Sequence, residues 1–324
     1  MTGWTIDSPN GIPTNWTVDE DKPDYSLQYL TFEALEDGTF KFSGTTASNT
    51  LSYSLDSGAT WTALAHNTNT PTVTSGSSIM FKGACTPQTN RGIGTFSSSG
   101  NFDAKGNVMS LLYRDNFSGQ TSLNGKSWAF CRLFSGSNII NSKNAVLPAT
   151  TLAEACYYSM FWSCTSLVTA PELPATTLTY GCYHDMFSGC TSLTTAPELP
   201  ATILAGTCYC QMFDGCTSLT TAPELPATNL AQSCYQNMFK GCTSLTIAPE
   251  LPATTLESEC YQAMFYDCTG LTTAPSILPA TTVRASSYYC MFNGCTSLTT
   301  GPSSIGNSAT TMAISACTGM FGGC

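Results

Sequence analysis

Cysteine is the residue type with the greatest chemical potential in this chain, which contains 17 of them among 324 residues. In an oxidising compartment so many cysteines ordinarily indicate a disulfide framework. Their spacing favours another arrangement, because Cys182 and Cys190 recur 26 residues later as Cys208 and Cys216. Stacked units would place equivalent cysteines about 4.8 Å apart. A disulfide tolerates that separation, but side chains in one column point the same way, which disfavours a bond between them. We therefore expect free, buried thiols that act as small apolar side chains, with disulfides as the alternative.

Metal ligation and catalysis have little to build on in this sequence. The closest cysteine pair is Cys208-x-Cys210, and no C-x-x-C pair is present to start a zinc site. The two histidines, His66 and His184, lie in no recognisable nucleophile context. Acid–base catalysis by paired carboxylates stays open, although no motif points to it. The sequence therefore predicts a protein that is not an enzyme and that uses no metal and no cofactor.

One short motif resembles a feature of an enzyme family. Residues 54–61 read Ser-Leu-Asp-Ser-Gly-Ala-Thr-Trp, which matches the S-x-D-x-G-x-T-W "Asp box" of sialidases. In those enzymes the motif braces a hairpin remote from the chemistry and is repeated on several propeller blades, whereas here it occurs once. A sialidase-like site would also need three convergent arginines, and this half of the chain offers only Arg91, Arg114 and Arg132. We interpret the motif as a structural brace.

A column of glutamates is the sharpest electrostatic feature of the sequence. Glu172, Glu198, Glu224 and Glu250 recur at one register and are followed there by Ser276. Stacked about 5 Å apart in water, these carboxylates would repel one another by roughly 1 kcal/mol or less. The simpler interpretation is a solvated corner after a proline. The alternative is a rail for a divalent cation or a basic partner.

The charge balance excludes several classes of function. Only 10% of the residues are charged, against about 25% in a typical protein, and the net charge is −10. Residues 147–324 contain two basic and ten acidic side chains, 2 − 10 = −8, which argues against nucleic acid and anionic membrane surfaces as partners. Small neutral ligands, glycans and proteins remain open. The sequence contains no apolar run of about 18 residues, so we expect no membrane span.

The N-terminal residues also lack the basic and apolar regions of a secretory signal. We expect either that a signal was removed or that the protein never used that route. A virion protein, which is released by lysis, would fit the second case.

The elements that must position these residues follow from an internal repeat. A fixed period in the range of 20–29 residues with regularly spaced leucines is typical of a solenoid. The period here is 26, with short insertions near the end, and a degenerate copy begins near Trp128. Leu-Pro-Ala-Thr occurs at residues 147, 173, 199, 225, 251 and 278, and Met-Phe at 160, 186, 212, 238, 264, 291 and 320.

Each unit contains two kinds of position. The Leu, Ala, Cys, Met and Phe positions that stay constant predict core ladders, with short strands at segments such as 175–178 and 192–196 and a helical turn or tight bend at Cys-Tyr-x-x-Met-Phe. Two columns vary from unit to unit, and variation within a rigid frame is how repeat proteins diversify a binding face. Neutral drift on an idle surface is the alternative. The predicted ligand-binding residues on this variable face are Tyr158, Trp162, His184, Asp214, Gln236, Lys240, Tyr266, Tyr289 and Asn293.

The repeat resembles a known family. The phrase Phe-x-x-Cys-Thr-Ser-Leu, followed by a proline-containing strand, is similar to the BspA-type leucine-rich repeats of surface proteins from gut and oral bacteria and of phages that infect them. The resemblance covers residues 128–324 and a lead-in at 107–113. It implies a leucine-rich-repeat solenoid of about seven turns, and it says almost nothing about the ligand.

The N-terminal half predicts a different β architecture. Residues 29–110 contain strand patterns at 30–34 and 39–42 around Asp37-Gly38, and at 51–54 and 60–62 around residues 56–58, which we interpret as two hairpins. Further strands are expected at 72–74, 79–82 and 94–96. A small immunoglobulin-like β-sandwich is therefore predicted for 29–110, ahead of a solenoid at 111–324. Residues 1–28, with Trp4 and Trp16, are expected to form an arm that docks to other virion proteins.

These features together predict a mainly β, non-enzymatic recognition protein. The favoured hypothesis is a phage virion surface or fibre protein, a possible homo-oligomer, whose solenoid contacts a host surface protein or glycan. The alternative is a bacterial cell-surface adhesin of the same repeat family whose signal peptide was removed. An accessory module of a glycan-active enzyme is a distant third.

Overall fold

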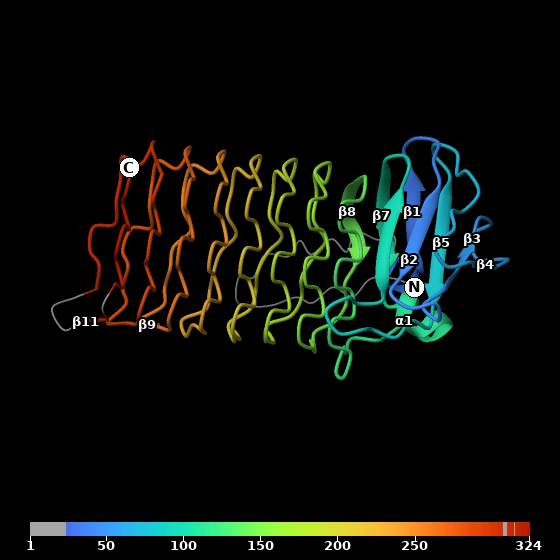
Figure 1. The fold of residues 1–324 in the computed structure, drawn as a ribbon, viewed down its shortest axis with the longest axis horizontal. Helices are drawn as coiled ribbons and strands as arrows, with labels where there is room; N and C mark the ends of the chain where they lie inside the picture. Colours follow the sequence, from blue (N-terminus) through green and yellow to red (C-terminus); the bar gives the residue numbers. More distant parts are fainter. Residues whose placement is uncertain (1–23, 307–309, 314) are drawn as a thin grey trace, which may run out of the picture.

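The computed structural model describes residues 24–306, 310–313 and 315–324, and the predicted docking residues Trp4 and Trp16 lie outside them. The described chain is mainly β, as expected, with only short helices (Figure 1). Its elements in chain order are η1 (Tyr25–Leu27), β1 (Leu30–Ala34), β2 (Phe40–Gly44), β3 (Leu51–Ser54), β4 (Thr62–Leu64), β5 (Ser78–Gly83), β6 (Gly94–Ser98), β7 (Phe102–Asn107), α1 (Ser110–Tyr113), η2 (Arg114–Asn116), β8 (Ile139–Val146), β9 (Thr255–Leu256), β10 (Thr282–Val283) and β11 (Thr311–Met312).

Two sheets face each other in the N-terminal part. One has six strands in the order β4-β3-β5-β1-β7-β8, and the other consists of β2 and β6. Phe32 on β1 is fully buried between them, with its ring centroid 5.3 Å from that of Phe40 on β2 and 4.9 Å from those of Phe81 on β5 and Phe96 on β6. Alternation of buried and partly exposed residues along β5 fits a strand with one face on this core.

The expected hairpin between the first two strands is wrong. β1 pairs with β5 and β7, whereas β2 pairs antiparallel with β6 in the other sheet. Both strands carry buried phenylalanines, and placing Phe32 and Phe40 on opposite sheets lets their rings pack against each other across the core, with the ring planes tilted by 49°. The segment expected as a strand at 72–74 makes a single bridge, from Val73 to Gly38. The second hairpin is confirmed, because β3 and β4 pair antiparallel with Leu51 opposite Leu64.

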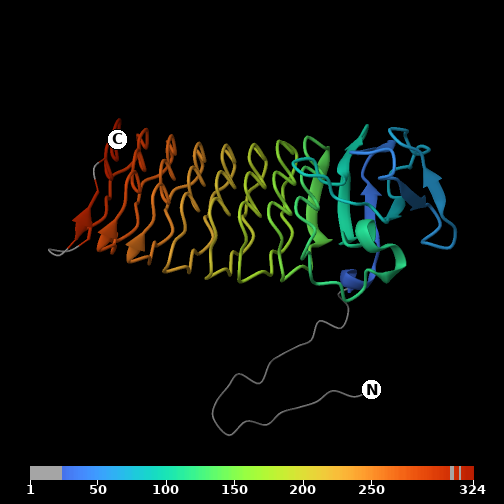
Figure 2. The ribbon, with the colours of Figure 1, turned by 60° about the horizontal axis from the view of Figure 1, so that its bottom comes forward.

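The chain from β8 onward winds into a row of parallel coils (Figures 1 and 2). Equivalent residues of adjacent coils pair in parallel, as in the bridges from Thr169 to Thr195 and from Thr195 to Thr221. At the far end these contacts extend into the three-stranded parallel sheet β11-β10-β9. Because each bridge joins residues about one repeat apart, the 26-residue period of the sequence is also the period of the coils.

One side of every coil is a chain of tight turns, which we call the turn ribbon. It comprises residues 153–164 and their equivalents in the other coils, the last being 315–324. Every fourth ribbon residue has a left-handed backbone, as at Ala155, Ser159 and Ser163, with φ near +50°. The Cys-Tyr-x-x-Met-Phe stretch, expected as a helical turn or tight bend, is thus a succession of such bends.

The ribbon backbone satisfies its own hydrogen bonds in an alternating pattern. Tyr157 N–H donates to Cys182 O of the next coil at 3.0 Å, whereas Tyr158 N–H donates within its own coil to Ala155 O at 3.1 Å. Phe161 and Trp162 repeat the pattern one turn later. Neighbouring coils are therefore locked in register without a regular sheet.

Ladders of identical side chains fill the inside of the row. The buried tyrosines from Tyr157 to Tyr288 stack with ring centroids 5.7–5.9 Å apart. A parallel ladder of phenylalanines runs from Phe134 to Phe321. The core continues without a break into the N-terminal part, where β8 pairs in parallel with β7.

Candidate functional site

The two variable columns lie on the outer surface of the turn ribbon. The backbone carbonyls of these residues accept hydrogen bonds from N–H groups of the preceding coil, and their own N–H groups donate within the same coil. Their side chains are therefore not needed to satisfy the backbone. Trp162 and Tyr289 are 46% and 38% exposed, whereas Ser188 and Cys210 in the same columns are buried. The other predicted residues of this face are partly exposed, namely Tyr158, His184, Asp214, Gln236, Lys240, Tyr266 and Asn293.

An aromatic cluster occupies the start of the ribbon. Tyr158 packs against Trp128 at 5.3 Å and stacks on His184 at 4.7 Å between ring centroids. His184 Nδ1 lies 3.0 Å from a carboxylate oxygen of Asp185. Burial, and then the charge of Asp185, raise the pKa of Tyr158 to about 12. Side-chain contacts of this kind give a pre-ordered aromatic surface.

Sequence reasoning missed Trp128 and Asp185 as members of this cluster. Trp128 stands in the degenerate first unit, where an offset of 27 rather than 26 residues hides its alignment. Asp185 occupies a left-handed position, with φ of 55°, that no residue type marks.

A polar cluster follows in the middle of the ribbon. Cys210 Sγ lies 3.7 Å from Gln236 Oε1, and Gln211 Nε2 donates to Asp214 at 3.4 Å. Burial raises the pKa of Asp214, while the Lys240 ammonium acts in the opposite direction. The ribbon is therefore aromatic at its start and polar and charged in its middle coils, and aromatic side chains return in the later coils at Tyr266 and Tyr289.

The Asp-box segment has the geometry of a brace. Asp56 accepts bonds from the N–H and hydroxyl of Thr60 at 2.8 and 2.6 Å, and Trp61 Nε1 donates to Gly58 O at 3.1 Å. The Thr60 bonds, and after them that from Ser54, lower the pKa of Asp56 to about 2. All of these partners lie within residues 54–61 of the β3–β4 hairpin, as the structural interpretation requires.

A basic and aromatic cluster that the sequence did not predict holds the same hairpin to its neighbours. Lys82 Nζ lies 2.7 Å from Asp115 and 4.1 Å from the Trp61 ring centroid, and Tyr29 hydroxyl donates to Asp115 at 2.6 Å. Burial, followed by the bond to Asp115, raises the pKa of Tyr29 to about 12. These contacts join β5, η2 and the hairpin, so the cluster fastens the outer strands of the sheet.

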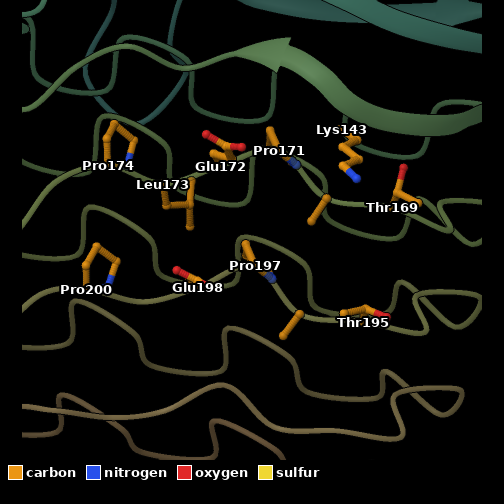
Figure 3. A pocket seen from close by; sticks show the side chains of 12 residues that line it. Lys143, Thr169, Pro171, Glu172, Leu173, Pro174, Thr195, Pro197, Glu198 and Pro200 are labelled. Atoms are coloured by element: carbon orange, nitrogen blue, oxygen red, sulfur yellow. The ribbon is translucent and has the colours of Figure 1, made fainter. Parts of the chain in front are cut away.

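The glutamate column lies along a corner of the coils, where the exposed residues are the same in successive coils, whereas those of the ribbon vary. Four successive corners read Ala-Pro-Glu-Leu-Pro, with Glu172, Glu198, Glu224 and Glu250 all exposed. Three cavities of about 600, 440 and 510 Å³ open in succession between adjacent corners. Figure 3 shows the first, with Pro171, Glu172 and Pro174 above their equivalents Pro197, Glu198 and Pro200.

All 17 cysteines are free, as expected, and most are buried. The thiols of one column donate to phenylalanine carbonyls, as Cys190 Sγ does to Phe161 O at 3.1 Å. Desolvation raises the pKa of buried thiols, to about 12 at Cys182. Thiolates are therefore disfavoured, so these side chains serve packing rather than nucleophilic chemistry.

The described residues contain no group of three or more His, Cys, Asp or Glu side chains placed to hold a metal ion. Within the same residues, no helix has the length and apolar character needed to cross a membrane. No protein-family model, curated protein or solved structure matches the chain.

Proposed function

We propose that the chain is a non-enzymatic recognition protein whose coils form a leucine-rich-repeat solenoid of the BspA type. The period of the coils and the Leu, Cys, Met and Phe ladders support this assignment. The two sheets that face each other across Phe32 support an immunoglobulin-like β-sandwich at residues 29–110, to which β8 of the following solenoid, proposed from 111 onward, adds one parallel strand.

The turn ribbon carries the functional proposal. Its backbone and buried ladders repeat from coil to coil, yet its two outward columns present a different side chain in almost every coil. Exposed aromatics such as Trp162 and Tyr289 offer large, rigid contact area for a protein or glycan surface. A fixed frame with changing side chains is the arrangement expected of a binding face.

The setting favoured by this proposal is the surface of a phage particle. A charge-poor, acidic exterior suits an exposed virion or fibre protein, with residues 1–28 as the arm that docks to other virion proteins. A bacterial cell-surface adhesin of the same repeat type is the second candidate. Genes for capsid and tail proteins beside this one would support the first setting, and a lipoprotein signal upstream of Met1 would support the second.

The test removes the exposed aromatic area of the ribbon. A protein carrying Trp162→Ala, Tyr266→Ala and Tyr289→Ala should keep its melting temperature within a few degrees, because these side chains are at least partly exposed. Its adsorption to host cells should fall about tenfold or more, the effect of losing a hot spot. The matched control is Ile203→Ala with Leu55→Ala, two side chains that are 60% and 48% exposed and lie outside both the ribbon and the glutamate corner. Unchanged adsorption of the triple variant would show that the ribbon is idle.

A further inference from the structure

The corner of the coils forms one continuous groove, which we call the corner groove. It is lined by residues 169–174, 195–200, 220–226 and 246–250, together with Pro252. The successive cavities share walls, since Pro197, Glu198 and Pro200 line both the first and the second. A ligand that occupies one cavity can therefore continue into the next.

The groove combines apolar walls with a charged rail. Alanine and proline are the most frequent residues of its lining, and the prolines equivalent to Pro174 are exposed in four successive corners. Threonine hydroxyls such as those of Thr195 and Thr221 stand along one side. The glutamates run between the two rows of proline (Figure 3).

The carboxylates of this rail are not neutralised by the protein. In the part of the chain that the structure describes, Glu172, Glu198 and Glu224 make no hydrogen bond or ion pair, whereas Glu250 accepts from Ser276 N–H at 3.0 Å. Lys143 stands at the head of the groove. The two cations of residues 147–324 are placed elsewhere, Lys240 on the ribbon and Arg284 at 3.1 Å from Glu257.

The exposed glutamate of the corner stays constant although it is not packed in the core. Exposed positions on the ribbon change from coil to coil, but the exposed glutamate and the exposed proline beside it recur in four successive corners. Like charges in register repel, so the row opposes folding slightly. An occupant that supplies the missing cations accounts for both the constancy and the charge.

We propose that the corner groove binds an extended segment of a partner protein that carries Lys or Arg at alternate positions. Alternate side chains of an extended chain point the same way, about 6.6–6.8 Å apart. The spacing of the coils is similar, since their stacked phenylalanine rings are 5.4–5.7 Å apart. Long, flexible Lys or Arg side chains can make up the difference between the two spacings. The methylene stems would cover the prolines while the charged ends reach the carboxylates.

A smaller cation suits the groove less well. A divalent ion or a polyamine would use the carboxylates, but it would leave apolar cavities of several hundred Å³ largely unfilled. A peptide backbone can also hydrogen-bond to the threonine hydroxyls. This site is separate from the ribbon, so the inference does not depend on the proposed recognition function.

The test measures binding of a fluorescein-labelled peptide of alternating Lys and Thr to the full chain by fluorescence anisotropy. Glu198→Gln with Glu224→Gln should weaken binding about tenfold, the loss of two charge pairs. Pro200→Ala with Pro226→Ala should weaken it about threefold through lost apolar contact. The matched control, Glu154→Gln with Asp267→Asn, removes the same charge outside the groove and should change affinity less than about twofold.

Three results would overturn the proposal. The control could weaken binding as much as the groove variant, which would mean general attraction to an acidic protein. An alternating Glu and Thr peptide could bind equally well, or spermine or calcium alone could show the full dependence on Glu198 and Glu224. The ribbon variant with three aromatics replaced should bind the peptide normally, so failure here and failure of the recognition proposal give different patterns.

Discussion

The turn ribbon and the corner groove are two exposed edges of the same coils. The exposed residues of the ribbon vary from coil to coil, whereas those of the corner groove recur. On the ribbon the backbone N–H and C=O groups are satisfied by hydrogen bonds within and between coils. The outward side chains can therefore change without disturbing the backbone. At the corner, two prolines in each Pro-Glu-Leu-Pro turn fix the backbone dihedrals and remove donors, and the same exposed side chains recur. The difference is what we expect from the two proposals, in which one edge diversifies its contacts while the other keeps a single one.

Both edges nevertheless depend on the same interior. The Tyr and Phe ladders lie beneath the ribbon, and the leucines that flank the glutamates, such as Leu199, are buried in the same continuous core. Contacts in such a row run mainly between neighbouring coils, so damage in one coil should affect both of its edges.

The largest expected effect comes from breaking the ladder under both edges. Phe213 is fully buried and stacks at 5.7 Å on Phe187 and 5.6 Å on Phe239. Phe213→Ala should cost about 3–5 kcal/mol in the free energy of unfolding, measured with urea. Amide hydrogen exchange should show lost protection on the ribbon and the corner of the same coils together. Ile203→Ala, at an exposed site, should stay within about 0.5 kcal/mol. Loss of protection on one edge alone would show that the edges are not coupled through this core.

A smaller effect should separate the two kinds of ribbon position. Thr207 is a β-branched residue at a left-handed position, with φ of 54°, where the equivalent residue one coil earlier is Gly181. Thr207→Gly should therefore stabilise the protein by about 0.5–1 kcal/mol, because glycine adopts this backbone without steric cost. Gln236→Gly, on the same ribbon but without a positive φ, should destabilise it by about 0.5–1 kcal/mol. Denaturation midpoints measure both, and equal signs would mean that the left-handed backbone is not what limits the sequence there.

The repeat let the sequence predict a large part of this architecture. Identical residues at a period of 26 pointed to stacked Leu, Cys and Phe positions, and the expected free thiols followed from like lying on like. The variable columns were also recognisable, because only exposed positions can change without opening cavities. All nine predicted ligand-binding residues lie on the ribbon, although Tyr158 and His184 stack on each other and so cover part of each other's surface.

Other features could not be predicted for physical reasons. Asp37-Gly38 signals a reversal of the chain, but it does not reveal that burial of Phe32 and Phe40 will send the two strands into different sheets. The left-handed positions carry ordinary residues such as Ala155 and Gln211, which have no glycine signature. The corner groove exists only between coils, so no single unit of the sequence displays it.

The smallest expected effect tests the charge of the corner directly. Glu198 has carboxylate neighbours one coil away on both sides, about 5 Å along the row, with no cation between them. Glu198→Gln should stabilise the protein by about 0.2–0.5 kcal/mol at low salt, because it removes like-charge repulsion. The gain should vanish between about 0.01 M and 1 M salt as the Debye length falls from about 30 to 3 Å. Glu154→Gln, outside the groove, is the control and should show no such gain. If Glu198→Gln instead destabilised the protein, the carboxylate would already be satisfied within the fold, and the constancy of the corner would need no occupant to explain it.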